Sequence, residues 1–246
     1  MTRSLGDGCG CFPTGRHYPG IAHLLKTTVR GLLPDVPADT PWQDLEIALL
    51  DVETTGRDAS VDRVVEVGIV VGVRGEVVKK YNWLINPGIT IPDEVIAVHH
   101  ITNEMVANEP RFEAVAGEIA EALRGRVPAA YNAMFDRAFM WGEFSRAKTD
   151  GAGIPALMKE VDWLDPLVWA RDIQDGEKSR SLGDVAARMG ISLENAHRAQ
   201  DDAEAALRVL YGLSRDPRMP RAYGALVQEQ RRLSQAQADA RRHWRS

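Results

Sequence analysis

A run of apolar residues that ends in two acids constrains the fold of this chain more than any other feature. Residues 47–52 read Ile-Ala-Leu-Leu-Asp-Val and are apolar on both faces, which is typical of a central strand covered on both sides. Asp51 and Glu53 are two residues apart, so in a strand they point to the same face. Two carboxylates this close repel each other, and their usual partner is a hard divalent cation such as Mg²⁺ or Mn²⁺. The commoner alternative is a pair of solvated acids, so other residues must decide.

The order of apolar patterns along the chain predicts a mixed α/β sheet with helices on both faces. Three consecutive strands are followed by helices that alternate with short strands. The expected strands are 47–52, 64–73, 77–85, 127–131 and 161–164. The expected helices are 92–98, 102–107, 112–123, 135–146, 165–173, 181–189 and 199–213. The pattern therefore predicts five strands in one sheet.

The length of 246 residues suits one domain of moderate size with extensions. Residues 1–44 are predicted to be a flexible N-terminal extension, with a short amphipathic helix at 21–33 followed by a Pro-rich linker. Residues 45–214 form the predicted main domain. Residues 215–246 form an Arg-rich helical tail that is poor in large apolar residues, so we expect it to pack weakly or only on a partner.

Composition favours a cytoplasmic protein. No apolar run reaches the roughly 20 residues that span a bilayer, and the first residues lack the apolar segment of a secretory signal. Cys9 and Cys11 are the two cysteines, too few for a structural zinc site. The net charge of −5 does not by itself indicate a nucleic-acid binder, but an enzyme that reaches phosphates through metal ions gains positive charge from its cofactor.

A second acid, Asp136, is expected in the first turn of a helix that follows a short buried strand and a turn containing Asn132. It shares a helix face with Phe139 and Met140, so its carboxylate points to the edge of the core rather than to water. On its own, Asp136 would be explained by its interaction with the helix dipole, about 0.3–1 kcal/mol.

The third group of polar residues combines a histidine with two adjacent aspartates. Helical geometry places Asp201 on a polar face and Asp202 on the packed face, where a carboxylate is costly without compensation. Asp202 is therefore the candidate metal ligand. His197 stands just before this helix. An isolated histidine is more often structural, but beside a metal-bound water a histidine is a natural general base, because the unperturbed pKa of an imidazole lies near neutrality.

These three segments together resemble the motifs of the DEDDh 3′–5′ exonucleases, the family of the proofreading epsilon subunit of bacterial DNA polymerase III. The resemblance covers about residues 45–213, with the motifs in the family's order and spacing. The matching patterns are Asp51-x-Glu53-Thr54-Thr55-Gly56, Asn132-x-x-Phe135-Asp136 and His197-x₄-Asp202. The resemblance implies an RNase H-like mixed five-stranded sheet.

The resemblance also implies a catalytic set. Two Mg²⁺ or Mn²⁺ ions about 4 Å apart would be held by four acids, and His197 would deprotonate the attacking water. The metal-binding acids would be Asp51, Glu53, Asp136 and Asp202. The substrate-contacting positions would be Thr54, Thr55, Glu94, His99 and Asn132. One departure is His100, which stands where the family usually has Gly, in the loop expected at the terminal base.

The function implied is removal of nucleoside 5′-monophosphates from single-stranded or frayed DNA 3′ ends, in proofreading or repair. The alternatives are an exoribonuclease or oligonucleotide-trimming enzyme of the same family, and a non-catalytic nucleic-acid-binding module. A DNA polymerase or another protein could dock on 21–33 or 221–246, and no membrane contact is expected. Glu66, inside an otherwise apolar strand, is interpreted as a buried structural hydrogen-bonding group.

Overall fold

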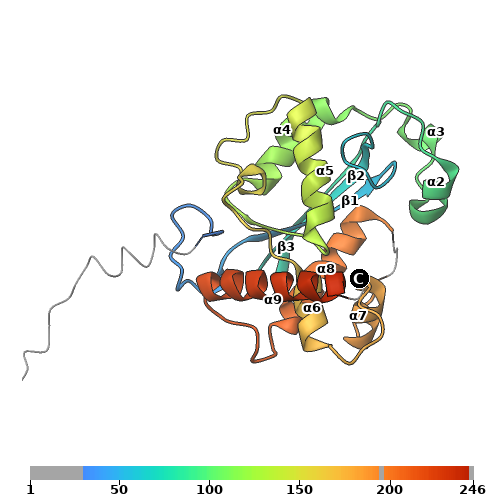
Figure 1. The fold of residues 1–246 in the computed structure, drawn as a ribbon. Coiled ribbons are helices and arrows are strands. Elements are labelled where there is room, and N and C mark those ends of the chain that lie inside the picture. Colours follow the sequence, from blue (N-terminus) through green and yellow to red (C-terminus); the bar gives the residue numbers. More distant parts are fainter. Residues whose placement is uncertain (1–29, 194–196, 244–246) are drawn as a thin grey trace, which may run out of the picture.

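A four-stranded mixed sheet forms the centre of the computed structural model, which describes residues 30–193 and 197–243 (Figure 1). The strand order is β3-β2-β1-β4. The strands are β1 (Ile47–Thr54), β2 (Val64–Val73), β3 (Glu76–Leu84) and β4 (Val127–Ala129). β1 pairs antiparallel with β2 and parallel with β4, and β2 pairs antiparallel with β3. The predicted mixed sheet is confirmed.

The prediction of a fifth strand at 161–164 is wrong. That segment makes only isolated parallel bridges, one between Val161 and Gly31 and one between Leu164 and Ala129. The physical reason lies in the next two residues. Asp165 caps the N-terminus of a helix and Pro166 is its first residue, so the chain leaves the sheet after a single ladder position.

Helices cover both faces of the sheet (Figure 1). They are α2 (Asp93–His99), α3 (Asn103–Val106), α4 (Phe112–Leu123), α5 (Ala133–Arg146), α6 (Pro166–Ile173), α7 (Leu182–Arg188), α8 (Ala199–Leu213) and α9 (Tyr223–His243), with short 3-10 turns at Trp42–Asp44 and Pro155–Leu157. Alternate residues of β1 belong to different cores: Leu49 packs with α6, α8 and α9, whereas Leu50 packs with α4 and α5. This two-sided burial explains why the strand is apolar on both faces.

Most of the N-terminal extension lies outside the described residues. The predicted flexibility of 1–20 and nearly all of the predicted helix 21–33 fall there, as do the two cysteines. The described end of that helix is not helical, because Gly31 forms a bridge and Leu33 is buried in the core. Further along, the fully buried Trp42 stacks on Tyr211 of α8 with ring centroids 5.7 Å apart, which fastens this segment to the domain.

Helix α9 is an integral part of the core, so the expectation of a weakly packed tail is wrong. Its inward residues recur at intervals of three or four and fill the core beside α6: Tyr223, Leu226, Val227, Gln230 and Leu233 are all buried. Gln, Ala and Arg residues make up most of the helix, so its overall composition is polar even though this narrow stripe is apolar. Within 30–193 and 197–243, every helix is too short or too polar to cross a membrane.

Candidate active site

Strand β1 presents Asp51 and Glu53 at the point where helix α8 approaches the sheet. Gly68 of β2 lies directly opposite Asp51. A β-carbon at Gly68 would overlap the backbone of Ala199 and Gln200, the first residues of α8. Glycine is therefore needed here because of close approach, and its absence of a side chain lets the start of α8 lie against β2. The acids of β1 and those of α8 are thereby brought together.

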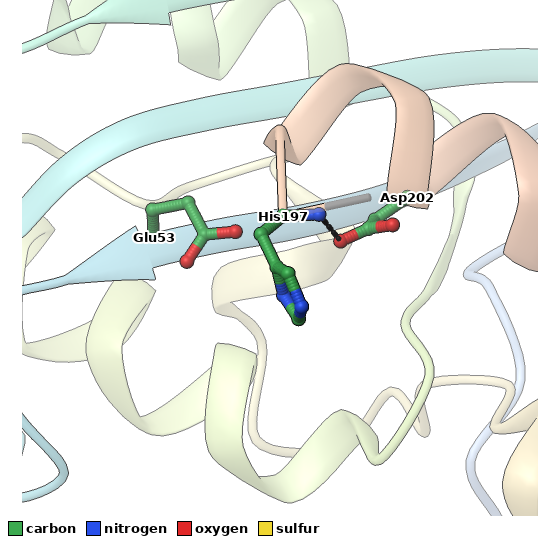
Figure 2. Close-up of side chains that lie close together, drawn as sticks. All are labelled: Glu53, His197 and Asp202. Carbon is green, nitrogen blue, oxygen red and sulfur yellow. Dashed lines mark hydrogen bonds between the residues drawn. The ribbon is translucent and has the colours of Figure 1, made fainter. Parts of the chain in front are cut away.

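The structure brings Glu53, His197 and Asp202 into one cluster (Figure 2). Each can offer one ligand atom such that these atoms all lie within 4.8 Å of one another. The His197 backbone N–H donates a hydrogen bond of 3.1 Å to Asp202 Oδ2, and Figure 2 shows the His197 side chain between the two acids. The His197 backbone is left-handed, with φ of 68°. Asp202, and not the adjacent Asp201, belongs to this cluster.

Asp136 joins the same site from α5. Its side chain is only 2% exposed, and its Oδ1 accepts a 3.2 Å hydrogen bond from the backbone N–H of Val52. Val52 lies between Asp51 and Glu53, so Asp136 contacts β1 where the first two acids stand. The four predicted metal-binding acids come from one strand and two helices. Among the described residues, Glu53 and Asp202 belong to the cluster with His197, whereas Asp51 and Asp136 lie outside it but near enough for their charges to act on each other and on Glu53.

All four acids have raised pKa values, and burial is the largest cause for each. For Asp51, the charges of Asp136, Glu53 and Asp202 raise the pKa further. For Glu53, burial followed by the charges of Asp202 and Glu66 raises the pKa to about 8. A group of buried, mutually repelling carboxylates is a set of hard oxygen donors, and it fits divalent cations that prefer such ligands.

Glu66 is the buried structural group that the sequence suggested, and it also contacts the start of α8. Its carboxylate accepts hydrogen bonds from the Arg198 guanidinium (2.6 Å), from Asn82 Nδ2 (2.9 Å) and from the backbone N–H of Ala199 (3.0 Å). The third of these bonds matters for the site, because the Ala199 N–H is an otherwise unsatisfied donor at the start of α8. Glu66 therefore holds the end of α8 that carries His197 and Asp202.

Asp165 is a site-supporting residue that the sequence analysis missed. Its carboxylate accepts hydrogen bonds from the backbone N–H groups of Asn132 (3.0 Å), Ala133 (3.1 Å) and Leu167 (2.9 Å). It therefore fixes the left-handed turn at Asn132 from which α5 and Asp136 begin. The Asp-Pro pair marks Asp165 as a helix cap, but no local signal reveals its bonds to a turn 33 residues earlier.

The predicted substrate-contacting residues differ in their burial and in their hydrogen bonds. Thr54 and Thr55 are buried, and their hydroxyls bond within the following turn, to the Gly56 carbonyl (2.5 Å) and to Asp62 (3.3 Å). Buried His99 accepts a 3.0 Å bond from the Ile101 N–H on Nδ1. Glu94 is exposed on α2 and makes no hydrogen bond or ion pair with another residue that the structure describes.

His100 ends α2 in the left-handed conformation, with φ of 61°. Glycine adopts this conformation without strain, whereas a residue with a β-carbon does so at a cost of about 1–2 kcal/mol. The Gly that the family resemblance implies at this position thus corresponds to a requirement of the backbone. The His100 side chain is exposed, so the substitution changes the surface beside His99 while the turn itself is preserved.

Comparison with known proteins places this geometry among exonucleases. Residues 49–210 match the exonuclease family RNase T. The chain is 33% identical over 159 residues to the DNA polymerase III subunit epsilon of Treponema pallidum, covering 65% of this chain and 72% of that protein. It is 32% identical over 167 residues to the PolC-type DNA polymerase III of Clostridium perfringens, covering 68% of this chain but only 11% of that much longer protein.

Solved structures agree on the fold. Exonuclease X in complex with 5′ overhanging duplex DNA is similar with a TM-score of 0.54 and 22% identity, over 71% of this chain and 95% of that one. A zinc-bound complex of E. coli exonuclease I with single-stranded DNA is similar with a TM-score of 0.61 and 19% identity, over 71% and 42% of the two chains. At these identities the likeness concerns the fold.

Proposed function

Since the chain belongs to the exonuclease family RNase T and is a 3′–5′ exonuclease of the DEDDh type, we propose that it releases nucleoside 5′-monophosphates from DNA 3′ ends. The observation that carries this proposal is the convergence of Glu53, His197 and Asp202 within 4.8 Å, with buried Asp136 bonded to β1 beside them. Hydrolysis of a phosphodiester needs a cation site, a proton acceptor and a positioned 3′ end, and this cluster offers the first two.

The cation site consists of Asp51, Glu53, Asp136 and Asp202, which would hold two Mg²⁺ or Mn²⁺ ions. Such ions, when bound, stabilise the negative charge that develops on a phosphodiester and lower the pKa of water. Burial and mutual repulsion raise the pKa values of these acids, so the chain itself leaves their charge uncompensated. That deficit supports a resident divalent cofactor.

His197 would accept the proton of the attacking water. Its side chain is exposed, and a ring nitrogen lies within 4.8 Å of carboxylate oxygens of Glu53 and Asp202, so a solvent molecule bound at these acids would be near it. The bond from the His197 backbone N–H to Asp202 fixes the base relative to one cation ligand. Positioned proton transfer of this kind contributes about 10²–10⁴-fold to rate.

DNA is the proposed polymer, and its 3′ ends in replication or repair are the proposed setting. The support comes from the relatives: the Treponema pallidum protein is a DNA polymerase III subunit, and the similar solved structures were determined with duplex or single-stranded DNA. A polymerase could dock on residues 21–33 or on the tail, and on α9 it would use the outer face, because Tyr223, Leu226 and Val227 fill the inner one.

The decisive test is hydrolysis of 5′-labelled single-stranded DNA by the purified chain with Mg²⁺ or Mn²⁺. We expect stepwise shortening from the 3′ end and release of 5′-mononucleotides. Asp51→Asn should abolish release, whereas Asp201→Asn is the matched control, because Asp201 neighbours Asp202 on α8 but is outside the cluster.

Running the same assay with RNA distinguishes the alternatives. Faster hydrolysis of RNA would replace DNA by RNA as the substrate and leave the chemistry intact. Failure to hydrolyse either polymer with either metal would refute the proposal. Binding of nucleic acid without hydrolysis would instead favour the non-catalytic module.

A further inference from the structure

A cavity of about 620 Å³ lies between α6, the segment before α7 and the far end of α9. We call it the basic cavity, because four of its lining residues are Arg171, Lys178, Arg180 and Arg241. Its other lining residues are neutral: Leu167, Ser179, Ser181, Gln237 and Ala240. No acidic side chain is among the described residues that line it. This is unusual in a chain whose net charge is −5.

The cations of the basic cavity lack acidic partners. In the described part of the chain, Arg171, Lys178 and Arg241 form no ion pair within 4 Å, and Arg180 donates to the backbone carbonyls of Gln174 and Asp175. Burial lowers the pKa of Arg171 and the nearby Arg241 lowers it further, while the charge of Asp165, which does not line the cavity, opposes this shift. Like charges gathered in this way repel one another unless an anion lies between them.

The unpaired state of Arg241 is specific to that position on α9. Other described arginines of this helix each have an acid beside them: Arg231 pairs with Asp162, Arg232 with Glu229 and Arg242 with Asp239. Arg241 and Arg242 are adjacent in sequence, yet one faces the cavity and the other faces an acid. The positive charge of the cavity is therefore a local arrangement and not a general property of an Arg-rich helix.

Hydrogen bonds through Asp165 connect the basic cavity with the turn at Asn132 from which α5 begins. Leu167 lines the cavity, and its backbone N–H donates to Asp165, the residue that also holds the N–H groups of Asn132 and Ala133. Tyr131, which directly precedes that turn, donates its hydroxyl proton to the Arg180 carbonyl at 2.6 Å. In Figure 1 the C-terminal end of α9 accordingly lies beside α7.

We propose that the basic cavity binds backbone phosphates of the DNA strand whose 3′ end lies at the acids. This inference rests on the proposed exonuclease function, since it assigns the upstream part of the same substrate. A polyanion meets repulsion at the carboxylates and needs cations along the rest of its path. Guanidinium groups suit this task, because they bind phosphate oxygens in a fixed fork. The tail helix therefore acts as half of a strand-binding site.

A binding assay tests the cavity separately from catalysis. In a hydrolysis-deficient Asp51→Asn background with Mg²⁺, fluorescence anisotropy measures the Kd of a 24-nucleotide and of a 3-nucleotide oligo-dT. Adding Lys178→Gln and Arg241→Gln should raise the Kd of the longer oligonucleotide about ten-fold. The slope of log Kd against log salt should become shallower by about 0.7 for each phosphate that the variant no longer neutralises. The control is Arg242→Gln, which removes the same charge one residue away.

The two oligonucleotides and the control decide the outcome. A larger rise in Kd for the longer oligonucleotide, together with the shallower salt slope, supports the basic cavity. An equal effect of Arg242→Gln, or an unaltered Kd and slope in the double variant, overturns it. If the wild-type chain hydrolyses no DNA but the double variant still weakens binding, the proposed function fails and the strand-binding site stands.

Discussion

Glu53 and Glu66 lie directly opposite each other on β1 and β2, yet their pKa values are displaced in opposite directions. Burial is the largest influence on both and raises both pKa values. For Glu66, hydrogen bonds from Arg198, Asn82 and the Ala199 N–H outweigh burial and lower the pKa below its usual range. For Glu53, Asp202 and Glu66 add repulsion, and the pKa reaches about 8.

The same division runs through the molecule. Glu143 is 1% exposed and, like Glu66, has its own cations: Arg63 Nε bonds to it at 2.7 Å and Arg146 at 3.1 Å. Its pKa is lowered despite burial. Glu66 and Glu143, which the chain supplies with arginines, are structural, and Asp165 is satisfied by backbone N–H groups instead. The four acids around β1 and α8 that raise one another's pKa values form no ion pair among the described residues. The location of the missing positive charge thus identifies the site at which an external cation is needed.

Neutralising one of the acids that lack an arginine partner should give the largest effects: a loss of activity and a gain in thermal stability. Asp51→Asn should reduce exonuclease activity by at least about 10³-fold, because it removes one of the four proposed cation ligands. In the absence of metal, the same variant should unfold at a higher temperature than the wild type, since a repelled buried charge is gone. Product release and thermal unfolding in EDTA measure the two effects. A lower unfolding temperature would contradict the comparison.

The metal-free protein should lose stability as pH rises from 5.5 to 8.5. The pKa of Glu53 is about 8 in the folded protein against 4.5 ordinarily, so the folded state keeps a proton that the unfolded chain releases. This stabilising contribution is complete below the ordinary pKa and is lost as pH rises through the folded one. We expect the unfolding temperature to fall by about 5–10 °C.

Divalent cations should reverse this loss, and more strongly at high pH, because they compete with protons for the same oxygens. Thermal scans at several pH values, with and without Mn²⁺, measure both effects. Glu53→Gln is the control and should flatten the metal-free profile. A wild-type profile that is flat or rising between pH 6 and 8 would show that Glu53 is ionised in the folded protein.

Neutralising an acid that has an arginine partner should lower the stability of the protein instead of raising it. Glu66→Gln should lower the free energy of unfolding by about 1–3 kcal/mol, because the Arg198 guanidinium and the Ala199 N–H lose a charged acceptor. Urea denaturation measures the loss. A stabilised Glu66→Gln variant would remove the distinction between Glu66 and Glu53. The remaining activity reports how strongly Glu66 positions the start of α8.

The smallest effect is expected where a paired acid has more than one cation. Arg146→Gln should cost less than about 1 kcal/mol, because Glu143 retains Arg63 and the Val64 N–H. Urea denaturation under the same conditions allows a direct comparison with Glu66→Gln. A loss of unfolding free energy as large as that of Glu66→Gln would mean that additional partners do not reduce the cost of removing one of them from a buried carboxylate.

Local periodicity placed parts of the candidate site, and the family resemblance combined them into one set. The period of two along β1 placed Asp51 and Glu53 on one face, and the helical period separated Asp202 from Asp201. What could not be predicted depends on contacts between distant segments. Glu66 meets the start of α8 across 133 positions, and Gln230 meets Asp165 across 65. The spacing of residues along a single segment contains no information about such pairs.

The errors in the predicted fold have the same origin. Residues 161–164 are apolar enough for a strand, but Asp165 and Pro166 begin a helix before a ladder can extend. The packing of α9 depends on a narrow apolar stripe that becomes informative only when α6 lies opposite it. The composition of a segment does not show that a helix start directly after it will end a strand. It also does not show which helix will pack against an apolar stripe once the chain has folded.

The buried Gln230 of α9 determines when, during synthesis, the active site gains its full set of supporting hydrogen bonds. Its side chain accepts from the Asp165 N–H (2.8 Å) and Trp169 Nε1 (3.2 Å) and donates to the Trp163 carbonyl (2.9 Å). Ribosomes make proteins from the N-terminus, so every catalytic motif is synthesised before α9. Until Gln230 has been added and has left the ribosome, the backbone around Asp165 lacks these bonds. The nascent nuclease therefore completes the support of its active-site turn only after translation has passed its catalytic residues.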